Sequence, residues 1–356
     1  MQKYSIHNEE KVKEILKENK FPPFRYAQIE NAIYKNFVTD FDNIETIPKD
    51  LRKLLNDNFF YSTLEIDEQK TSANWQTTKT LYKTETWEFI ESVIMRHKTW
   101  RVTLCISCQA WCPMACSFCA TGKLGLLKNL EDYEMIEQIL AAAKMLSEEE
   151  SMNLRNIVFM WMWEPMLNYD NVAYTIRAST AQKKLDLSNR RITVSTCGII
   201  PWIERFTDDF PQTSLAVSLH SPNDEVRKSI MPVDHTYPLK DLMKCLDNYT
   251  KKTNKRIFYE YIMINWVNDH PKLADELWQL LQWKLAHVNF IPYNAWEGTN
   301  SDGFTTTPKI IIDKFQKVLL DKYNVVSTVR MTMWDDIDAA CGQLANKKVG
   351  EKELKN

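Results

Sequence analysis

Three cysteines near the middle of the chain have the spacing of metal ligands. Cys112, Cys116 and Cys119 form a C-x3-C-x2-C pattern in "WCPMACSFCATG", with Cys105 and Cys108 just upstream. Three thiolates at this spacing can bind three irons of a cubane cluster and leave the fourth iron open to a substrate or cofactor. Alternatively, three cysteines and one histidine would bind a structural zinc ion, or the three thiols would be buried without a ligand. The spacing alone leaves all three interpretations open.

The chain around these cysteines alternates between apolar runs typical of strands and longer helical stretches. The expected strands are "VTLCIS", "NIVFM", "RITVST", "SLAVSLH", "RIFYEYIMI" and "HVNFIPY", and a helical segment is expected after each of them except "RITVST". This alternation predicts an α/β fold whose parallel sheet is open or closed into a partial barrel. Ligands of such sheets bind at the carboxyl ends of the strands. The polar residues expected at these ends are Glu164, Ser195, Ser218, His220 and Asn294.

The rest of the chain predicts how the domains are organised. Residues 1–60 have apolar residues at helical spacing and predict a small helical accessory domain. Residues 61–97 alternate polar and apolar side chains, as antiparallel strands do, and predict a β-rich connector. Residues 98–345 then form the core, and residues 346–356 form a charged tail.

Composition narrows the class of protein. Forty-five basic and 47 acidic residues give a formal net charge of -2, so the whole-chain charge does not indicate a polyanionic partner. The amino-terminal residues are charged throughout and lack the apolar core of a signal peptide. No stretch is apolar enough to span a bilayer, which predicts a cytoplasmic protein.

The residues after the cysteines carry a family resemblance. Phe118 directly precedes the third cysteine in a loop after the first core strand, which resembles the cluster motif of radical S-adenosylmethionine (SAM) enzymes. The match extends in order from about residue 22 to Ala345 and is similar to the RlmN family. The segments that carry it are "LCISCQAWCPMACSFCATGKLGLLKNL", "VFMWMWEPMLNYDNV", "RITVSTCGIIP", "SLAVSLHSPNDEVR", "NFIPYN" and "DDIDAACGQLA". The resemblance implies a partial (β/α)6 barrel of TIM type that methylates carbon 2 of an adenine in 23S ribosomal RNA and in certain transfer RNAs.

The resemblance also implies roles for individual residues. Cys112, Cys116 and Cys119 would bind one [4Fe-4S] cluster, and a second group would line the SAM site: Trp163, Glu164, Ser195, Ser218, Leu219, His220 and Asn294. Cys341 matches the cysteine that becomes S-methylcysteine, and Cys105 matches the cysteine that forms a disulfide with it to release the product. Glu91 matches the family's proton acceptor. Carbon 2 of adenine is electrophilic, so a carbon radical is needed and two SAM molecules are used per turnover.

The implied partners are 23S ribosomal RNA, transfer RNA and a one-electron donor such as flavodoxin, with the protein acting as a monomer away from membranes. Candidate phosphate contacts in the accessory domain are Lys11, Lys13, Arg25, Lys35, Arg52 and Lys53. One alternative is a relative that methylates carbon 8 of the same adenine and confers antibiotic resistance. Another is a non-catalytic RNA-binding protein that keeps a cluster or zinc only for folding. The presence of both Cys105 and Cys341 argues against the non-catalytic alternative.

Nine of the 12 tryptophans stand where the RlmN family has glycine, and the chain has only 7 glycines. The nine are Trp75, Trp87, Trp100, Trp111, Trp161, Trp163, Trp266, Trp283 and Trp334, and the assignment of Trp202 is less clear. Nine such changes are expected to unfold the protein or block its site. One hypothesis is that the source reads the codon UGA as glycine and that the sequence was decoded with UGA as tryptophan. If the tryptophans are genuine, Trp163 would intrude on the SAM site and the protein would be inactive or repurposed.

Overall fold

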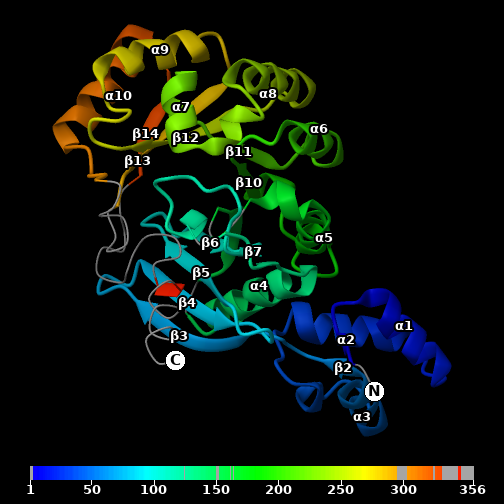
Figure 1. Cartoon of the computed structure of the whole chain (residues 1–356). Helices are drawn as coiled ribbons and strands as arrows, with labels where there is room; N and C mark the ends of the chain where they lie inside the picture. The colour runs from blue at the N-terminus through cyan, green and yellow to red at the C-terminus, as the bar shows by residue number, and fades with distance from the viewer. Residues whose placement is uncertain are drawn as a thin grey trace.

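The computed structural model describes residues 3–123, 125–149, 152–160, 162, 164–294, 303–323, 325–330 and 344–345. Its centre is a ten-stranded sheet with the order β14-β13-β12-β11-β10-β9-β6-β5-β4-β3 (Figure 1). The strands are β3 (Glu65–Thr71), β4 (Thr77–Lys83), β5 (Phe89–Arg96), β6 (Val102–Ile106), β9 (Leu154–Phe159), β10 (Ile192–Thr196), β11 (Ser214–Ser218), β12 (Ile257–Met263), β13 (Ala286–Pro292) and β14 (Ser327–Val329). Two small sheets pair β1 (Tyr4–Ser5) with β2 (Phe59–Phe60), and β7 (Gln109–Ala110) with β8 (Lys128–Asn129).

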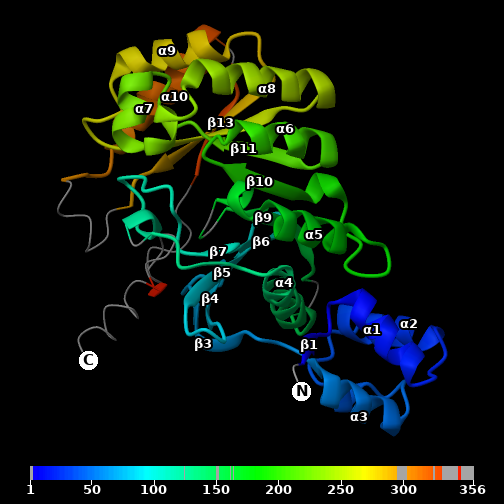
Figure 2. The ribbon, with the colours of Figure 1, turned by 45° about the vertical axis from the view of Figure 1, so that its right-hand side comes forward.

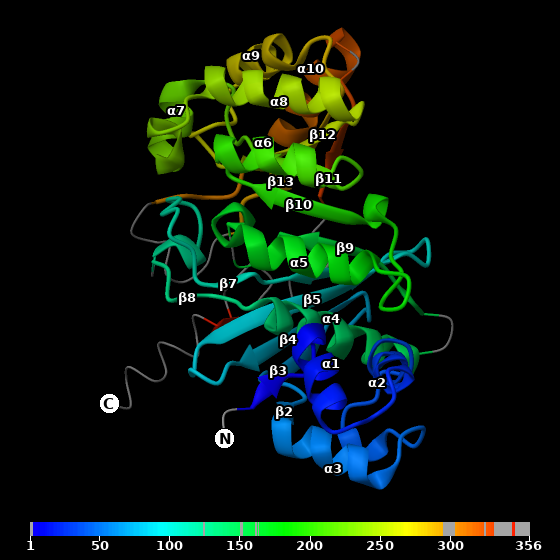
Figure 3. The ribbon, with the colours of Figure 1, turned by 90° about the vertical axis from the view of Figure 1, so that its right-hand side faces the viewer.

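Within the ten-stranded sheet, the seven strands β6 and β9 to β14 are all parallel, and a helical segment follows each of the six expected strands. The helices are α4 (Asp132–Ser147), α5 (Tyr169–Thr180), α6 (Ile200–Asp209), α7 (Asp224–Ile230), α8 (Leu239–Thr253), α9 (Pro271–Leu281) and α10 (Lys309–Tyr323). Helices α4, α5, α6 and α8 lie side by side along one face of the sheet (Figures 2 and 3). The predicted α/β fold with a parallel core is therefore confirmed, and β14 is a strand that the sequence did not predict.

The connector joins this sheet directly. Strands β3, β4 and β5 form antiparallel hairpins, and β5 pairs antiparallel with β6 so that Val93 lies opposite Cys105. Both β4 and β5 are almost entirely buried. No helix in the described part of the chain is both long enough and apolar enough to cross a membrane.

The amino-terminal helices have a hydrophobic core of their own. They are α1 (Glu9–Glu18), α2 (Phe24–Tyr34) and α3 (Lys49–Asn58), beside α4 in Figure 2. Val12, Ile29 and Leu51 are buried in this core, which also includes Ile136 and Leu140 of α4. The helical unit therefore packs on the outside of the barrel, while its predicted boundary near residue 60 stays a prediction.

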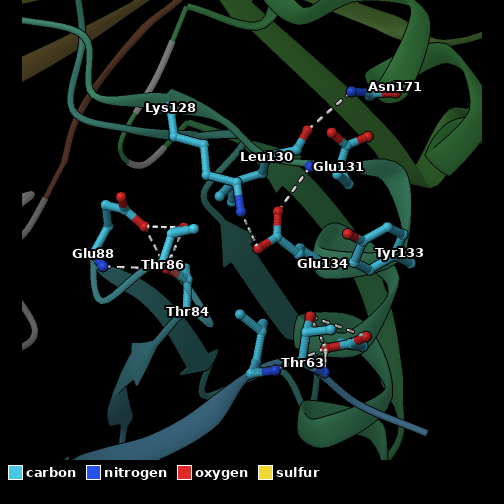
Figure 4. A network of polar contacts seen from close by, with 12 residues as sticks. Thr63, Thr84, Thr86, Glu88, Lys128, Leu130, Glu131, Tyr133, Glu134 and Asn171 are labelled. Carbon is cyan, nitrogen blue, oxygen red and sulfur yellow. Dashed lines mark hydrogen bonds and ion pairs between the residues drawn. The ribbon is translucent and has the colours of Figure 1, made fainter. Parts of the chain in front are cut away.

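A polar network fastens the start of α4 (Figure 4). Lys128 Nζ contacts Glu134 Oε1 at 2.8 Å, and the Glu131 amide donates to Glu134 Oε2 at 2.8 Å. One turn later, the carboxylate of Glu137 accepts hydrogen bonds from the Thr63 amide at 2.9 Å and from the Leu64 amide at 3.0 Å. Burial raises the pKa of Glu137 to about 7, although these hydrogen bonds oppose the rise. The first core helix is thus tied both to the connector and to the end of the cysteine loop.

Six of the nine tryptophans at family glycine positions lie within the described residues, and all six have positive φ. The values are 59° for Trp75, 70° for Trp87, 60° for Trp100, 65° for Trp111, 62° for Trp266 and 64° for Trp283. This left-handed region favours glycine because a Cβ crowds the following carbonyl. Trp202 and Trp278 lie inside α6 and α9 and do not have positive φ. Among the tryptophans that the structure describes, positive φ therefore occurs at the six family glycine positions and not at the two helical positions.

The turns that hold these tryptophans are ones that usually contain glycine. The amides of Trp75, Trp87 and Trp100 donate to the carbonyl three residues earlier, at 2.9, 3.0 and 2.9 Å, in the three hairpins between β3 and β6. A turn followed by a left-handed residue is a common hairpin connection with glycine at that position. Trp283 follows the C-cap residue of α9, where glycine commonly ends a helix. Its side chain is 97% exposed, and that of Trp266 is 91% exposed.

Candidate active site

The three motif cysteines lie in the loop between β6 and α4, and short contacts fold this loop over the sheet. The Cys112 amide donates to the Thr121 carbonyl at 3.4 Å, and the Cys119 amide donates to the Cys116 carbonyl at 3.1 Å. The Ser117 amide donates to the carbonyl of Ile230, at the end of α7, at 3.1 Å. Cys112 is buried, whereas Cys116 and Cys119 are half-buried. The loop therefore holds its cysteines close to the following strand ends.

The thiols of the motif are near enough to interact. Burial raises the pKa of Cys112 and of Cys116 well above the usual thiol range, and the neighbouring Cys119 raises both further. A cationic metal centre would reverse this effect, since it stabilises thiolates. In the described part of the chain, no three His, Cys, Asp or Glu side chains converge on one metal position. Three thiols in one loop are the type of ligand set that a [4Fe-4S] cluster takes, since each thiolate would bind a different iron.

Glu164 connects the end of β9 to the end of β10. Its Oε2 accepts from the Cys197 amide at 2.7 Å, its Oε1 accepts from the Met166 amide at 3.1 Å, and its own amide donates to Gln109 Oε1 at 2.7 Å. Burial raises the pKa of Glu164, and its charge raises the pKa of Cys112. The Glu164 carboxylate, which is predicted to bind SAM, is therefore fixed at a strand end beside the cysteine loop. Trp163 lies outside the described residues.

The next predicted group, Ser218 to His220, lies at the carboxyl end of β11. The amides of Leu219 and His220 donate to the Glu260 carbonyl at 3.0 and 3.2 Å, and His220 has a φ of 57°. Its ring packs edge-on against Phe118, with the ring centroids 4.9 Å apart. Burial, and then the charge of Arg227, lower the pKa of His220 to about 3, so its ring is neutral. Phe118 of the cysteine motif thus directly contacts His220, one of the residues predicted to bind SAM.

The two remaining predicted SAM residues also lie at strand ends. Ser195 is buried in β10 opposite Ala216 of β11, and Asn294 follows β13 and is half-buried. The structure therefore places Glu164, Ser195 and the Ser218–His220 segment at the ends of three adjacent strands.

Sequence reasoning missed Arg227, which is a central contact of this site. The side chain is fully buried and forms an ion pair with the fully buried Asp234. Its guanidinium donates to the Cys197 carbonyl at 2.7 Å and to the Leu219 carbonyl at 3.1 Å. It also lowers the pKa of Cys116 against the effect of burial. Arg227 ends the segment "SLAVSLHSPNDEVR" of the family resemblance, and nothing in the local sequence distinguishes this arginine from a solvated one.

Glu91 lies in β5 on the other side of β6. It is fully buried and pairs with Lys79, Nζ to Oε2 at 3.1 Å. Its Oε1 accepts from the Ala345 amide at 2.8 Å, so the segment four residues after Cys341 reaches β5. Cys341 itself lies outside the described residues. Two residues along β5 from Glu91, Val93 lies opposite Cys105 of β6.

Cys105 has a free thiol in the structure, so the Cys105–Cys341 disulfide implied by the resemblance is not supported. Burial raises the pKa of Cys105 to about 12, which keeps the thiol protonated. A protonated thiol does not attack another sulfur, so a disulfide would require this environment to change. Cys108, Cys197 and Cys245 are also free and buried.

Comparisons with known proteins agree with this geometry. A model of the radical SAM superfamily matches residues 106–277. The dual-specificity RNA methyltransferase RlmN of Clostridium tetani is 37% identical over 340 residues, which cover 96% of this chain and 95% of that protein. Its counterpart from Bacillus licheniformis is 38% identical over 349 residues, with 98% and 94% covered. The crystal structure of a radical SAM methyltransferase from Sphaerobacter thermophilus matches with a TM-score of 0.89 and 36% identity, over 96% of this chain and 98% of that one.

The barrel and its three-cysteine loop define a radical SAM enzyme, a class that uses a [4Fe-4S] cluster and SAM. Identity at this level over almost the whole chain narrows the class further. The chain belongs to the RlmN family of radical SAM RNA methyltransferases.

Proposed function

We propose that the chain methylates carbon 2 of a specific adenosine in 23S ribosomal RNA and in certain transfer RNAs, through a methylated Cys341. The observation that carries this proposal is the hydrogen bond from the Ala345 amide to Glu91 Oε1. It brings the segment after Cys341 to β5, and β5 pairs with the strand that holds Cys105. The three residues that the methylene transfer needs thus belong to adjoining segments of the chain.

In this proposal the cysteine loop and the strand ends hold the cofactors. Cys112, Cys116 and Cys119 bind one [4Fe-4S] cluster, and the strand-end residues bind SAM: Trp163, Glu164, Ser195, Ser218, Leu219, His220 and Asn294. When bound there, the cluster and SAM would supply the radical chemistry that activates the methyl group on Cys341. The carboxylate of Glu164 accepts from the SAM ammonium group, and the serine hydroxyls hydrogen-bond its ribose. Glu164 and Ser195 are buried, which excludes water from their contacts.

The protein residues carry the transfer itself. The thiolate of Cys341 accepts a methyl group from a first SAM, so one turnover uses two SAM molecules. Glu91 accepts a proton from the adenine ring, and Cys105, on the adjoining strand, acts in the release step that breaks the bond between the Cys341 sulfur and the transferred carbon. Lys79 pairs with Glu91 and positions its carboxylate beside the carboxyl-terminal segment.

The partners follow the same proposal: 23S ribosomal RNA and transfer RNA as substrates, flavodoxin as an example of the one-electron donor, and a cytoplasmic monomer. Of the basic residues expected to contact RNA, Lys11, Lys13 and Lys53 form exposed ion pairs with acidic neighbours. Such pairs contribute about 0–1 kcal/mol, so phosphates can displace them.

The test is anaerobic reconstitution of the full chain with iron and sulfide, followed by reaction with 23S ribosomal RNA, SAM and a reductant. The expected result is a four-iron cluster and 2-methyladenosine, identified by mass mapping of the digested RNA. A product methylated at carbon 8 would overturn the choice of carbon, and bound zinc without SAM cleavage would overturn the enzymatic proposal.

Two variants separate the cysteine roles. Cys341→Ala is expected to keep the cluster and form no methylated RNA, because it has no thiol to carry the methyl group. Cys105→Ala is expected to accumulate RNA covalently bound to protein, since the release step is lost. Cys245→Ala is the matched control, because Cys245 lies in α8 away from these segments, and it should leave product formation unchanged.

A further inference from the structure

A cavity of about 630 Å³ opens at the amino ends of the barrel strands. Its lining includes Thr103, Asn156, Thr193 and Ser214, each at or near the first residue of its strand. Side chains two residues apart in a strand share a face, so Cys105, Ser195 and Ser218 point to the same interior as this lining. The cavity therefore continues the interior beneath the predicted SAM site towards the opposite mouth of the barrel.

Glu260 of β12 lies between the cavity and the SAM residues. Its carbonyl accepts from the amides of Leu219 and His220, and its side chain lines the cavity and is only 3% exposed. Oε1 accepts from Asn289 Nδ2 at 2.9 Å, and Asn289 Oδ1 accepts from the Thr328 hydroxyl at 2.7 Å. Oε2 is buried and has no hydrogen-bond partner among the described residues. A buried carboxylate oxygen in this state is typical of a site that a ligand completes.

The charges around the cavity indicate the kind of ligand. Arg101, Arg190, Arg191 and Arg330 line it, so its mouth favours an anion such as a phosphodiester. Burial raises the pKa of both Cys105 and Glu260, and the charge of Arg330 opposes the rise in both, which places both residues near the same arginine. Val158 and Phe258 add apolar surface suited to a flat ring. The cavity thus combines a rim of four arginines, an apolar wall and the buried Oε2 of Glu260, which has no hydrogen-bond partner among the described residues.

We infer that Glu260 is a specificity-determining residue that recognises the target base, its Oε2 accepting a hydrogen bond from the 6-amino group of the adenine. This inference rests on the proposed function. Asn289 orients the carboxylate, and the adenine lies between β12 and the strand of Cys105, with the RNA phosphates at the arginines. Adenine is selected because its 6-amino group is a donor, whereas guanine presents an oxygen acceptor at the same position.

The experiment compares two 23S ribosomal RNA fragments that carry adenosine or purine riboside, which lacks the 6-amino group, at the modified position. The holoenzyme is expected to methylate the adenosine fragment with a kcat/KM about 10- to 100-fold higher. In Glu260→Gln, Asn289 Nδ2 keeps the amide oxygen on its side, so the glutamine amide would meet the 6-amino group donor to donor. The ratio should then fall to about one.

The matched control is Glu276→Gln, the same change on α9 outside the cavity, which should keep the parent's ratio. A general loss of stability would lower both rates and leave their ratio unchanged, so the ratio isolates base recognition. If Glu260→Gln does not assemble its cluster, Thr328→Val removes the hydroxyl that orients Asn289 and should reduce the preference. Equal rates for both fragments with the parent enzyme, or an undiminished preference in Glu260→Gln, would overturn the inference. No methylation of either fragment by the parent enzyme would instead overturn the proposed function.

Discussion

Replacing Trp283 with glycine is expected to stabilise the protein, although it removes the largest side chain. Trp283 has a φ of 64° directly after the C-cap residue of α9, and its side chain is 97% exposed. A residue with a Cβ pays about 1–2 kcal/mol in the left-handed region. Because the indole buries almost no surface, little hydrophobic free energy offsets that cost.

The magnitude follows from two opposing terms. Glycine removes the left-handed penalty but gives the unfolded chain extra entropy worth about 0.5–1 kcal/mol, so the net gain for Trp283→Gly is about 0.5–1 kcal/mol. Trp75, Trp87, Trp100 and Trp266 are also exposed at positive φ, between 65% and 91%. The effects of distant sites add, so the five changes together should contribute about 2.5–5 kcal/mol. That is a large share of the roughly 5–15 kcal/mol that stabilises a typical native protein.

Urea unfolding followed by far-ultraviolet circular dichroism measures this gain, because backbone amides dominate that signal and the midpoint does not depend on its amplitude. Trp283→Ala is the decisive control, since it also removes the indole but keeps the Cβ, and it should gain only a small part of the glycine effect. Trp278→Gly, in the interior of the same helix, should instead destabilise by at least about 1 kcal/mol. Equal stabilities for Trp283→Ala and Trp283→Gly, or a glycine variant below the parent, would refute the conformational argument.

Three further predictions concern the gene and two buried carboxylates. The codons for the six positive-φ tryptophans should be UGA, while Trp202, which stacks on Tyr169 with ring centroids 5.0 Å apart, should be encoded by UGG; gene sequencing decides both. Burial raises the folded-state pKa of Glu137 from its ordinary value of 4.5 to about 7. The free energy of unfolding should therefore fall by about 1–3 kcal/mol as the pH rises from the lower to the higher of these values. Urea midpoints at pH 5 and pH 8 should show a smaller fall for Glu137→Gln. Lys79→Met should destabilise by about 3–5 kcal/mol because it leaves Glu91 buried without its cation, and adding Glu91→Gln should recover much of the loss.

Local sequence pattern was sufficient for much of the fold and for the cysteine loop. The six expected strands form a parallel sheet, as predicted, because their buried apolar runs suit a sheet covered by helices. Glu164 and Ser218 were expected at strand ends and lie there, since a strand end depends mainly on local residues. The short β14 escaped prediction because "STV" is too brief to show a periodic pattern.

The contacts that hold the site together could not be predicted in the same way. Arg227 donates to carbonyls at residues 197 and 219, and the Ala345 amide donates to Glu91 across 254 positions of sequence. These pairs form only after the parallel strands have brought distant loops together, so no local pattern contains them. The buried Oε2 of Glu260, which has no hydrogen-bond partner among the described residues, could not be predicted either. The segment "FYEYIM" shows a polar residue in a strand but not what its side chain faces.

Trp111 shows why the exposed turns, and not the cysteine loop, test whether the backbone favours glycine at the tryptophan positions. It has a φ of 65°, like the others, but its side chain is fully buried next to Cys112. Removing a buried indole from a structure packed around it costs about 3–5 kcal/mol, which exceeds the left-handed penalty of about 1–2 kcal/mol. In a chain that carries tryptophan at this position, Trp111→Gly would therefore destabilise the protein through lost packing, and the result would not report the backbone conformation. At Trp283 no packing opposes the backbone, so the sign of the change reports the conformation alone.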